Sequence, residues 1–145
     1  MFGVDIDLQV IWQNLVLLAI AYVLALPVAM NRERQARSAG LRTFPLVAIA
    51  ACGYMLVGTS VFADARAQAR ILEGLVTGIG FIGGGAILKS RGSVSGTATA
   101  ASIWNTGAIG VAVAYGRFEI AILLSTINFI TLRYVSKFKS KPDEG

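Results

Sequence analysis

Hydroxyl and amide side chains recur along one apolar stretch of the chain, residues 98–115. Thr99, Ser102 and Thr106 are spaced by three and four residues, so on a helix their hydroxyls share one face, and Asn105 lies on a neighbouring face. Polar side chains in hydrocarbon usually turn toward the interior of a bundle. They either form hydrogen bonds between helices or line a substrate or partner pathway, and the sequence leaves both interpretations open.

Two carboxylates form a candidate cation site. Glu73 stands near the start of the apolar stretch 71–88, and Asp64 lies in the segment before it. Mg²⁺ prefers hard oxygen ligands, usually one or two carboxylates with retained waters. The alternative is that Glu73 only interacts with the positive end of the helix dipole. We find no deeper carboxylate, which argues against a conventional ion pump within one chain.

The stretch 74–85 is dense in glycine. Three of these glycines match the dinucleotide pattern GxGxxG, but they lie inside the apolar run, without the preceding strand and the later acidic residue that the fingerprint requires. Pairs spaced by four residues let another helix approach to near backbone contact, so close helix packing is the favoured interpretation. The alternative is that the helix unwinds over 80–85 and its carbonyls line a polar cavity. The close-packing candidates are Gly74, Gly78, Gly80, Gly83, Gly84 and Gly85.

A basic cluster follows the first apolar stretch. It predicts a cytoplasmic loop that contacts lipid headgroups, and the alternative is a docking site for an acidic partner. Lys and Arg residues gather between apolar stretches elsewhere as well, so membrane topology explains them better than nucleic-acid binding does. The loop motif comprises Arg32, Glu33, Arg34, Arg37, Gly40, Arg42 and Thr43.

Five apolar stretches must position these residues. The chain is 55% hydrophobic and only 14% charged, whereas soluble domains carry roughly a quarter charged residues. A membrane-spanning helix needs about 20 residues. We therefore predict an all-α, polytopic membrane bundle of about five transmembrane helices, at 8–30, 44–62, 71–88, 98–115 and 118–135.

The distribution of charge predicts an N-out, C-in topology, because this places every basic-rich loop on the cytoplasmic side. We expect a transmembrane domain over 1–136 and a short basic cytoplasmic tail over 137–145, with no soluble domain. The acidic start of the chain does not resemble a cleavable signal peptide, so the first helix is expected to be retained. The expected location is the bacterial inner membrane, as a multi-pass protein.

The chain is not expected to be an enzyme. It has no histidine and one cysteine, and no carboxylate pair or activated nucleophile is evident, so we assign no catalytic residue. We expect no cofactor beyond Mg²⁺ as a substrate or ligand, and the sequence leaves the metal-binding residues unknown. The expected partners are the lipid bilayer, further copies of the chain in a homo-oligomer and another membrane protein, but no nucleic acid.

Three ordered motifs resemble the MgtC/SapB family of bacterial inner-membrane proteins. They are the loop motif 32–43, the run Thr77-Gly78-Ile79-Gly80-Phe81-Ile82-Gly83-Gly84-Gly85, and Gly96-Thr97-Ala98-Thr99-Ala100-Ala101-Ser102-Ile103-Trp104. The resemblance implies a link to growth in low magnesium, to intracellular virulence in some members and, in one branch, to restraint of the proton-translocating ATP synthase. Many members are labelled transporters.

This chain departs from the family pattern in two ways. The better-known virulence members carry a soluble C-terminal domain that has no counterpart among these 145 residues, and Ala98 stands where the family usually has a polar residue. Two hypotheses follow. The chain is either an oligomeric Mg²⁺ transporter or sensor, or a non-transporting regulator that binds another membrane complex through its glycines.

Overall fold

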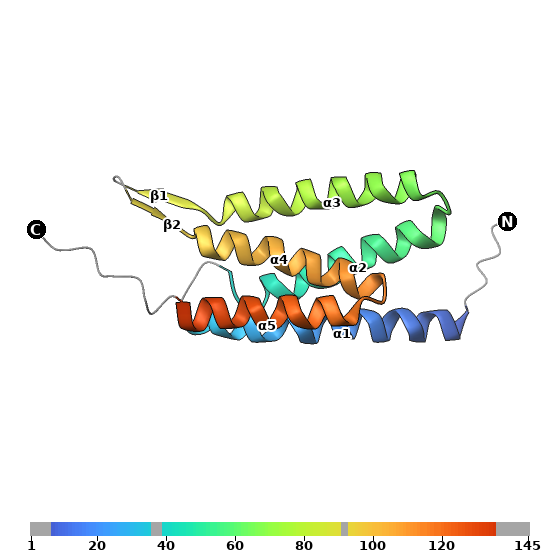
Figure 1. Cartoon of the computed structure of the whole chain (residues 1–145), viewed down its shortest axis with the longest axis horizontal. Helices are drawn as coiled ribbons and strands as arrows, with labels where there is room; N and C mark the ends of the chain where they lie inside the picture. Colours follow the sequence, from blue (N-terminus) through green and yellow to red (C-terminus); the bar gives the residue numbers. More distant parts are fainter. Residues whose placement is uncertain (1–6, 36–38, 91–92, 136–145) are drawn as a thin grey trace, which may run out of the picture.

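The computed structural model describes residues 7–35, 39–90 and 93–135, and over these residues the chain is helical apart from one short hairpin (Figure 1). This confirms the all-α prediction in its main feature. The elements, in chain order, are α1 (Leu8–Arg34), α2 (Thr43–Val61), α3 (Ala65–Gly85), β1 (Leu88–Ser90), β2 (Ser93–Ser95), α4 (Thr97–Ala114) and α5 (Phe118–Tyr134). The predicted boundaries of the first, second, fourth and fifth helices are close to these bounds, except that α1 continues to Arg34.

Aspartate side chains begin two of the helices. Asp7 accepts a hydrogen bond from the backbone N–H of Gln9 at 2.8 Å, and Asp64 accepts one from the backbone N–H of Arg66 at 3.3 Å. An N-cap of this kind satisfies a backbone donor that has no partner within the helix. Asp64 therefore begins α3 six residues before the predicted start, because Ala65 to Arg70 continue directly from the cap.

The glycine-rich stretch is helical throughout. α3 runs through Gly85, so the alternative in which the helix unwinds over 80–85 is wrong. Leu88, which was expected at the end of this helix, lies instead in β1, where it pairs with Ser95 of the antiparallel β2. The hairpin was not predicted, because its strands are only three residues long.

Gly96 makes the turn from the hairpin into α4. Its φ of 88° lies in the left-handed region, which glycine adopts without the steric cost that other residues meet. A Cβ atom at this position would also collide with the carbonyl oxygen of Ala86. The first residue of the third sequence motif is therefore required by backbone geometry.

α4 is the central helix of the bundle. It packs against α1, α2, α3 and α5, most extensively against α2. The core is built largely from small side chains on α1, α2 and α4, including Ala21, Ala25, Ala48, Ala51 and Ala112. α3 is peripheral, touching α2 and α4 (Figure 1), and within it only Ile79 and Gly83 are buried.

Large apolar side chains cover much of the outer surface. Trp12, Tyr54, Phe81 and Leu123 are each more than half exposed. α1 and α2 are long and apolar enough to cross a membrane, while α3, α4 and α5 do not pass the same test of length and composition. Two such helices are weak evidence by themselves, so a bundle that crosses the membrane five times stays a prediction.

The two ends of the bundle differ in charge. α1 and α5 both finish at the end that carries the hairpin (Figure 1), which gathers Arg32, Arg34 and Arg133 there. The opposite end mixes the two signs, with Asp7, Asp64 and Glu119 at the starts of α1, α3 and α5 and with Arg66, Arg70 and Arg117 beside them. This asymmetry agrees with the predicted N-out, C-in orientation without testing it, and the predicted tail 137–145 lies outside the described residues.

Candidate functional site

The three hydroxyls predicted on one face of α4 are buried together. Thr99, Ser102 and Thr106 are each at most 3% exposed. The Thr106 hydroxyl donates to the Ser102 carbonyl oxygen at 2.7 Å, four residues back on the same helix. The Ser102 hydroxyl lies at the same distance from the Ala98 carbonyl oxygen, and bonds of this kind let these two short side chains lie inside an apolar bundle.

Ser102 also connects α4 to α5. Its Oγ lies 2.7 Å from the Ala98 carbonyl oxygen and 3.0 Å from the atom placed as Asn128 Oδ1. A hydroxyl has a single proton and cannot donate to both oxygens. Among the described residues, the buried Asn128 Nδ2 atom has no hydrogen-bond partner. Exchanging the amide oxygen and nitrogen lets the Ser102 hydroxyl accept at this 3.0 Å contact instead of donating. Ser102 then donates to Ala98 and accepts from the Asn128 amide.

Two further polar contacts hold α5 in place. The Asn105 side-chain amide donates to the Leu124 carbonyl oxygen at 3.3 Å, and the Ser125 hydroxyl donates to the Leu24 carbonyl oxygen of α1 at 2.6 Å. Ser125 was not singled out from the sequence, because a lone serine has no spacing that predicts a partner. The geometry of this interior favours hydrogen bonding within and between helices over a solvated pathway.

The candidate carboxylates do not join this polar interior. Glu73 is exposed on α3, and Asp64 is exposed at the N-cap of the same helix. Ile79 meets Gly107, and Gly83 meets Ala100, so the start of α3 lies beside the end of α4, away from Thr99 and Ser102. Within the described ranges, no three His, Cys, Asp or Glu side chains are grouped to hold a metal ion.

The predicted close-packing glycines fall into two groups. A Cβ atom on Gly83 would lie 3.1 Å from the Ala100 carbonyl oxygen, so this glycine brings α3 close to α4. The other five face open space in a single chain, with no atom within 4 Å of the added Cβ: Gly74, Gly78, Gly80, Gly84 and Gly85. Any close packing by these five requires something outside the described chain.

Two glycines of α4 make close contacts that the sequence analysis missed. A Cβ atom on Gly110 would collide with the Ala48 carbonyl oxygen and lie 2.9 Å from the Ala51 Cβ atom of α2. A Cβ atom on Gly107 would collide with Ile79 of α3. Gly107 and Gly110 are three residues apart, so the sequence offered a pair of nearby glycines here too, but a less dense one than in the run 74–85.

The described residues of the loop motif shape the turn that follows α1. A Glu33 carboxylate oxygen accepts a hydrogen bond from the backbone N–H of Leu41 at 3.0 Å, which folds the chain back after α1. Gly40 is required beside it, because a Cβ atom there would collide with the same carboxylate. Arg32 is buried and donates to the Gln35 side chain at 3.2 Å. Arg37 lies outside the described residues.

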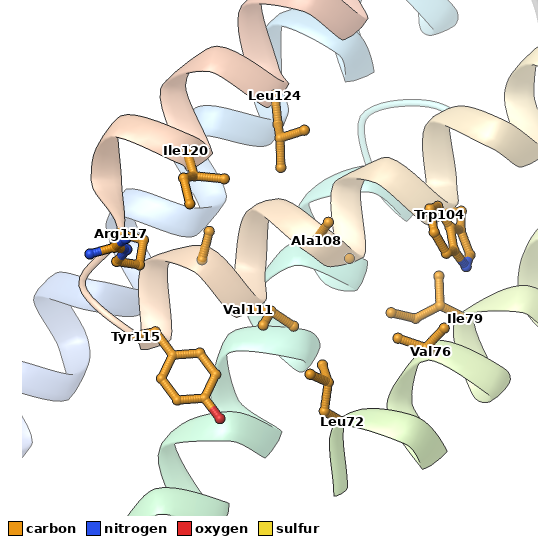
Figure 2. A pocket seen from close by; sticks show the side chains of 12 residues that line it. Leu72, Val76, Ile79, Trp104, Ala108, Val111, Tyr115, Arg117, Ile120 and Leu124 are labelled. Atoms are coloured by element: carbon orange, nitrogen blue, oxygen red, sulfur yellow. The ribbon is translucent and has the colours of Figure 1, made fainter. Parts of the chain in front are cut away.

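An apolar groove of about 380 Å³ runs between α3, α4 and α5. Figure 2 shows Leu72 and Val76 on one wall and Ile120 and Leu124 on the other, with Arg117 at one end. Arg117 forms an exposed ion pair with Glu119 at 3.3 Å. The polar side chains that line the groove are those of Trp104, Tyr115 and Arg117, and none of the described lining residues is a carboxylate, a cysteine or a histidine.

Comparison with known proteins decides the family. The MgtC family model matches residues 18–141, which is most of the chain. The chain belongs to the MgtC family. Among other MgtC-family proteins, it is 36% identical to SrpB of Synechococcus elongatus over 135 residues, covering 84% of this chain and 72% of SrpB. No solved structure matches this MgtC-family chain.

Two enterobacterial members of the MgtC family extend beyond the matched region. "Putative magnesium transporter YhiD" of Escherichia coli is 36% identical over 112 residues, which cover 72% of this chain and 52% of YhiD. Protein MgtC of Salmonella typhimurium is 36% identical over 107 residues, which cover 74% of this chain and 46% of that protein. The match thus spans about half the length of these two MgtC-family relatives.

Proposed function

We propose that this MgtC-family chain is a multi-pass protein of the bacterial inner membrane that acts in Mg²⁺ homeostasis as a homo-oligomer. Membership of the family, together with a relative named for magnesium transport, supports the Mg²⁺ link. The observation that carries the proposal is the unoccupied glycine face of α3. We define this glycine face as Glu73, Gly74, Thr77, Gly78, Gly80, Phe81, Gly84 and Gly85, all of which are exposed.

The glycine face has the geometry of a helix-packing surface with a carboxylate at one end. Glu73, Thr77, Gly80 and Gly84 are spaced by four, three and four residues, so they lie along one line of the helix. In hydrocarbon, helices associate through small residues that let backbones approach closely. A second α3 packed here would bring two Glu73 carboxylates near one another at the outer end. They would supply acidic ligands, which the described residues do not provide in the interior of one chain.

The transport version is tested by Mg²⁺ flux into liposomes that contain the purified protein. Glu73→Gln removes the carboxylate of the glycine face and is expected to lower flux by about tenfold or more, the effect of losing one charged ligand contact. Glu119→Gln is the matched control, because Glu119 is an exposed carboxylate at the same end of the bundle. Flux no greater than in empty liposomes, or equal loss in both variants, would rule out this version.

The second candidate is a regulator that does not transport and binds another membrane complex, such as the proton-translocating ATP synthase. The polar interior between α4 and α5 supports it, because the buried polar side chains there are hydroxyls and amides and none of the described ones is a carboxylate. In this version the glycine face of α3 packs against a helix of the partner complex instead of a second copy.

Gly78→Leu tests the regulator version. The larger side chain is expected to abolish co-purification of the partner complex while the chain still folds, because Gly78 faces open space in the monomer. Gly53→Leu is the control, since Gly53 also has no neighbour within 4 Å but lies on α2. An unchanged pull-down in Gly78→Leu would count against this function.

A further inference from the structure

A second groove, of about 690 Å³, lies between the final turns of α1 and α5. Its floor is apolar and includes Pro27, Met30 and Phe129, while Arg34 and Arg133 line it from the two helices. The apolar lining begins at Val23, eleven residues before Arg34. At 1.5 Å per residue this gives an apolar path of about 16 Å that ends at two guanidinium groups.

Three polar side chains of this groove, those of Asn31, Arg34 and Arg133, have hydrogen-bonding or charge capacity that the described residues leave unused. Neither Arg34 nor Arg133 forms an ion pair with any described residue, whereas Arg117 is paired with Glu119. Asn31, which also lines the groove, is 7% exposed, and its Nδ2 atom has no hydrogen-bond partner among the described residues. A buried donor left without an acceptor is costly, so this amide adds to the polar capacity of the groove that the described residues leave unused.

Helix-dipole stabilisation explains only part of this arrangement. A basic residue in the last turn of a helix is favourable by itself, and this accounts for Arg34 and Arg133 separately. It does not account for the groove that joins them or for the unpartnered Asn31 amide. Because both helices present their negative ends here, a bound anion would lie beyond the backbone termini, at the reach of the long arginine side chains.

We propose that this groove binds an anionic phospholipid, with its phosphate between Arg34 and Arg133 and an acyl chain along the apolar floor. Basic pockets between transmembrane helices on the cytoplasmic side suit anionic headgroups. A free phosphate ion would contact the guanidinium groups, but it would leave the apolar path of about 16 Å empty. The inference rests on the membrane location in the proposed function, but not on Mg²⁺ transport.

Native mass spectrometry of the full chain released from detergent tests the inference. The protein is titrated with phosphatidylglycerol, phosphatidylcholine or inorganic phosphate, and the lipid-bound fraction is measured. Phosphatidylglycerol is expected to bind, and Arg34→Gln with Arg133→Gln is expected to weaken binding by about tenfold or more, since two charge-assisted contacts are lost. Arg66→Gln with Arg70→Gln removes the same charge from exposed positions at the opposite end and is expected to leave binding unchanged.

A third variant separates lipid binding from charge. Met30→Trp fills the apolar floor without altering either arginine and is expected to weaken phosphatidylglycerol binding as well. If the double glutamine variant fails to fold, the Met30→Trp result decides the outcome, with Arg34→Lys and Arg133→Lys expected to retain partial binding.

Three outcomes would overturn the inference: no phosphatidylglycerol adduct, equal loss in the two double variants, or inorganic phosphate competing as well as the lipid. Failure of the membrane proposal is distinguishable, because the protein would then be monodisperse in buffer without detergent. Failure of the transport proposal would leave the lipid result unaffected.

Discussion

At the scale of single residues, glycines determine how closely the helices pack, because they have no side chain to hold two backbones apart. In hydrocarbon there is little hydrophobic force between helices, so association depends on close packing. Gly110 lets α4 lie directly against the Ala48 carbonyl and the Ala51 methyl group of α2. Gly83 performs the same role between α3 and α4, with Ala100 as its neighbour.

We expect Gly110→Ala to destabilise the bundle by about 1–3 kcal/mol, the range for overpacking a filled interior. The added methyl group would collide with backbone atoms of α2, which cannot rotate away. Thermal unfolding in detergent, followed by circular dichroism, measures the change. Gly53→Ala is the matched control, because a Cβ atom on Gly53 of α2 would meet no neighbour within 4 Å. Equal melting of both variants would show that α2 and α4 are not in close contact.

At the scale of elements, α3 and α5 are the least buried helices, and α3 buries the smallest share of its length. Only Ile79 and Gly83 are buried in α3, whereas α4 buries nine residues along most of its length. Apolar grooves lie on both sides of α3, one toward α2 and one toward α5. A helix held by so few contacts has a low free energy of local opening.

Hydrogen exchange in detergent is therefore expected to be faster in α3 than in α4, by on the order of tenfold or more at matched mid-helix amides. In the monomer, amides of 70–80 should exchange before those of 103–113. Protection of α3 should rise in the reconstituted oligomer, because the glycine face would then be covered. Equal protection of the two helices in the monomer would contradict the peripheral position of α3.

At the scale of the whole molecule, the arrangement of charged ends bears on orientation. The hairpin and the ends of α1 and α5 share one end of the bundle, and the connection from α2 to α3 lies at the other (Figure 1). If the basic end lies in the cytoplasm, Ser93 of β2 is on the cytoplasmic side of the membrane. Ala63, between α2 and α3, is then on the opposite side. Both residues are exposed in the structure.

Labelling with a membrane-impermeant maleimide tests this orientation. In a Cys52→Ala background, Ala63→Cys is expected to react in spheroplasts, and Ser93→Cys only after the membrane is permeabilised. Cys52 is buried, so the parent protein should label poorly. The reverse pattern would invert the proposed topology, and labelling of both sites in spheroplasts would mean that the described bundle does not separate two compartments.

The sequence by itself determined five apolar helices, most of their boundaries and the family, because apolar run length and ordered glycine motifs are local properties of the chain. It also indicated that Thr99, Ser102 and Thr106 share a face, because a spacing of three and four residues fixes this on any helix. The sequence did not predict the hairpin or the early start of α3, since short strands and a single aspartate cap are weak signals in one sequence.

Only the tertiary structure decided which glycines pack and which face outward. Gly74, Gly78 and Gly83 look alike in the sequence, and the difference arises from which side of α3 faces the neighbouring helices. The same holds for Asn128, whose amide meets Ser102, a residue 26 positions away in the chain. It also holds for Arg34 and Arg133, which lie at the ends of helices far apart in the sequence and line one groove. Spacing along a chain specifies one helix face, but helix packing determines what that face meets.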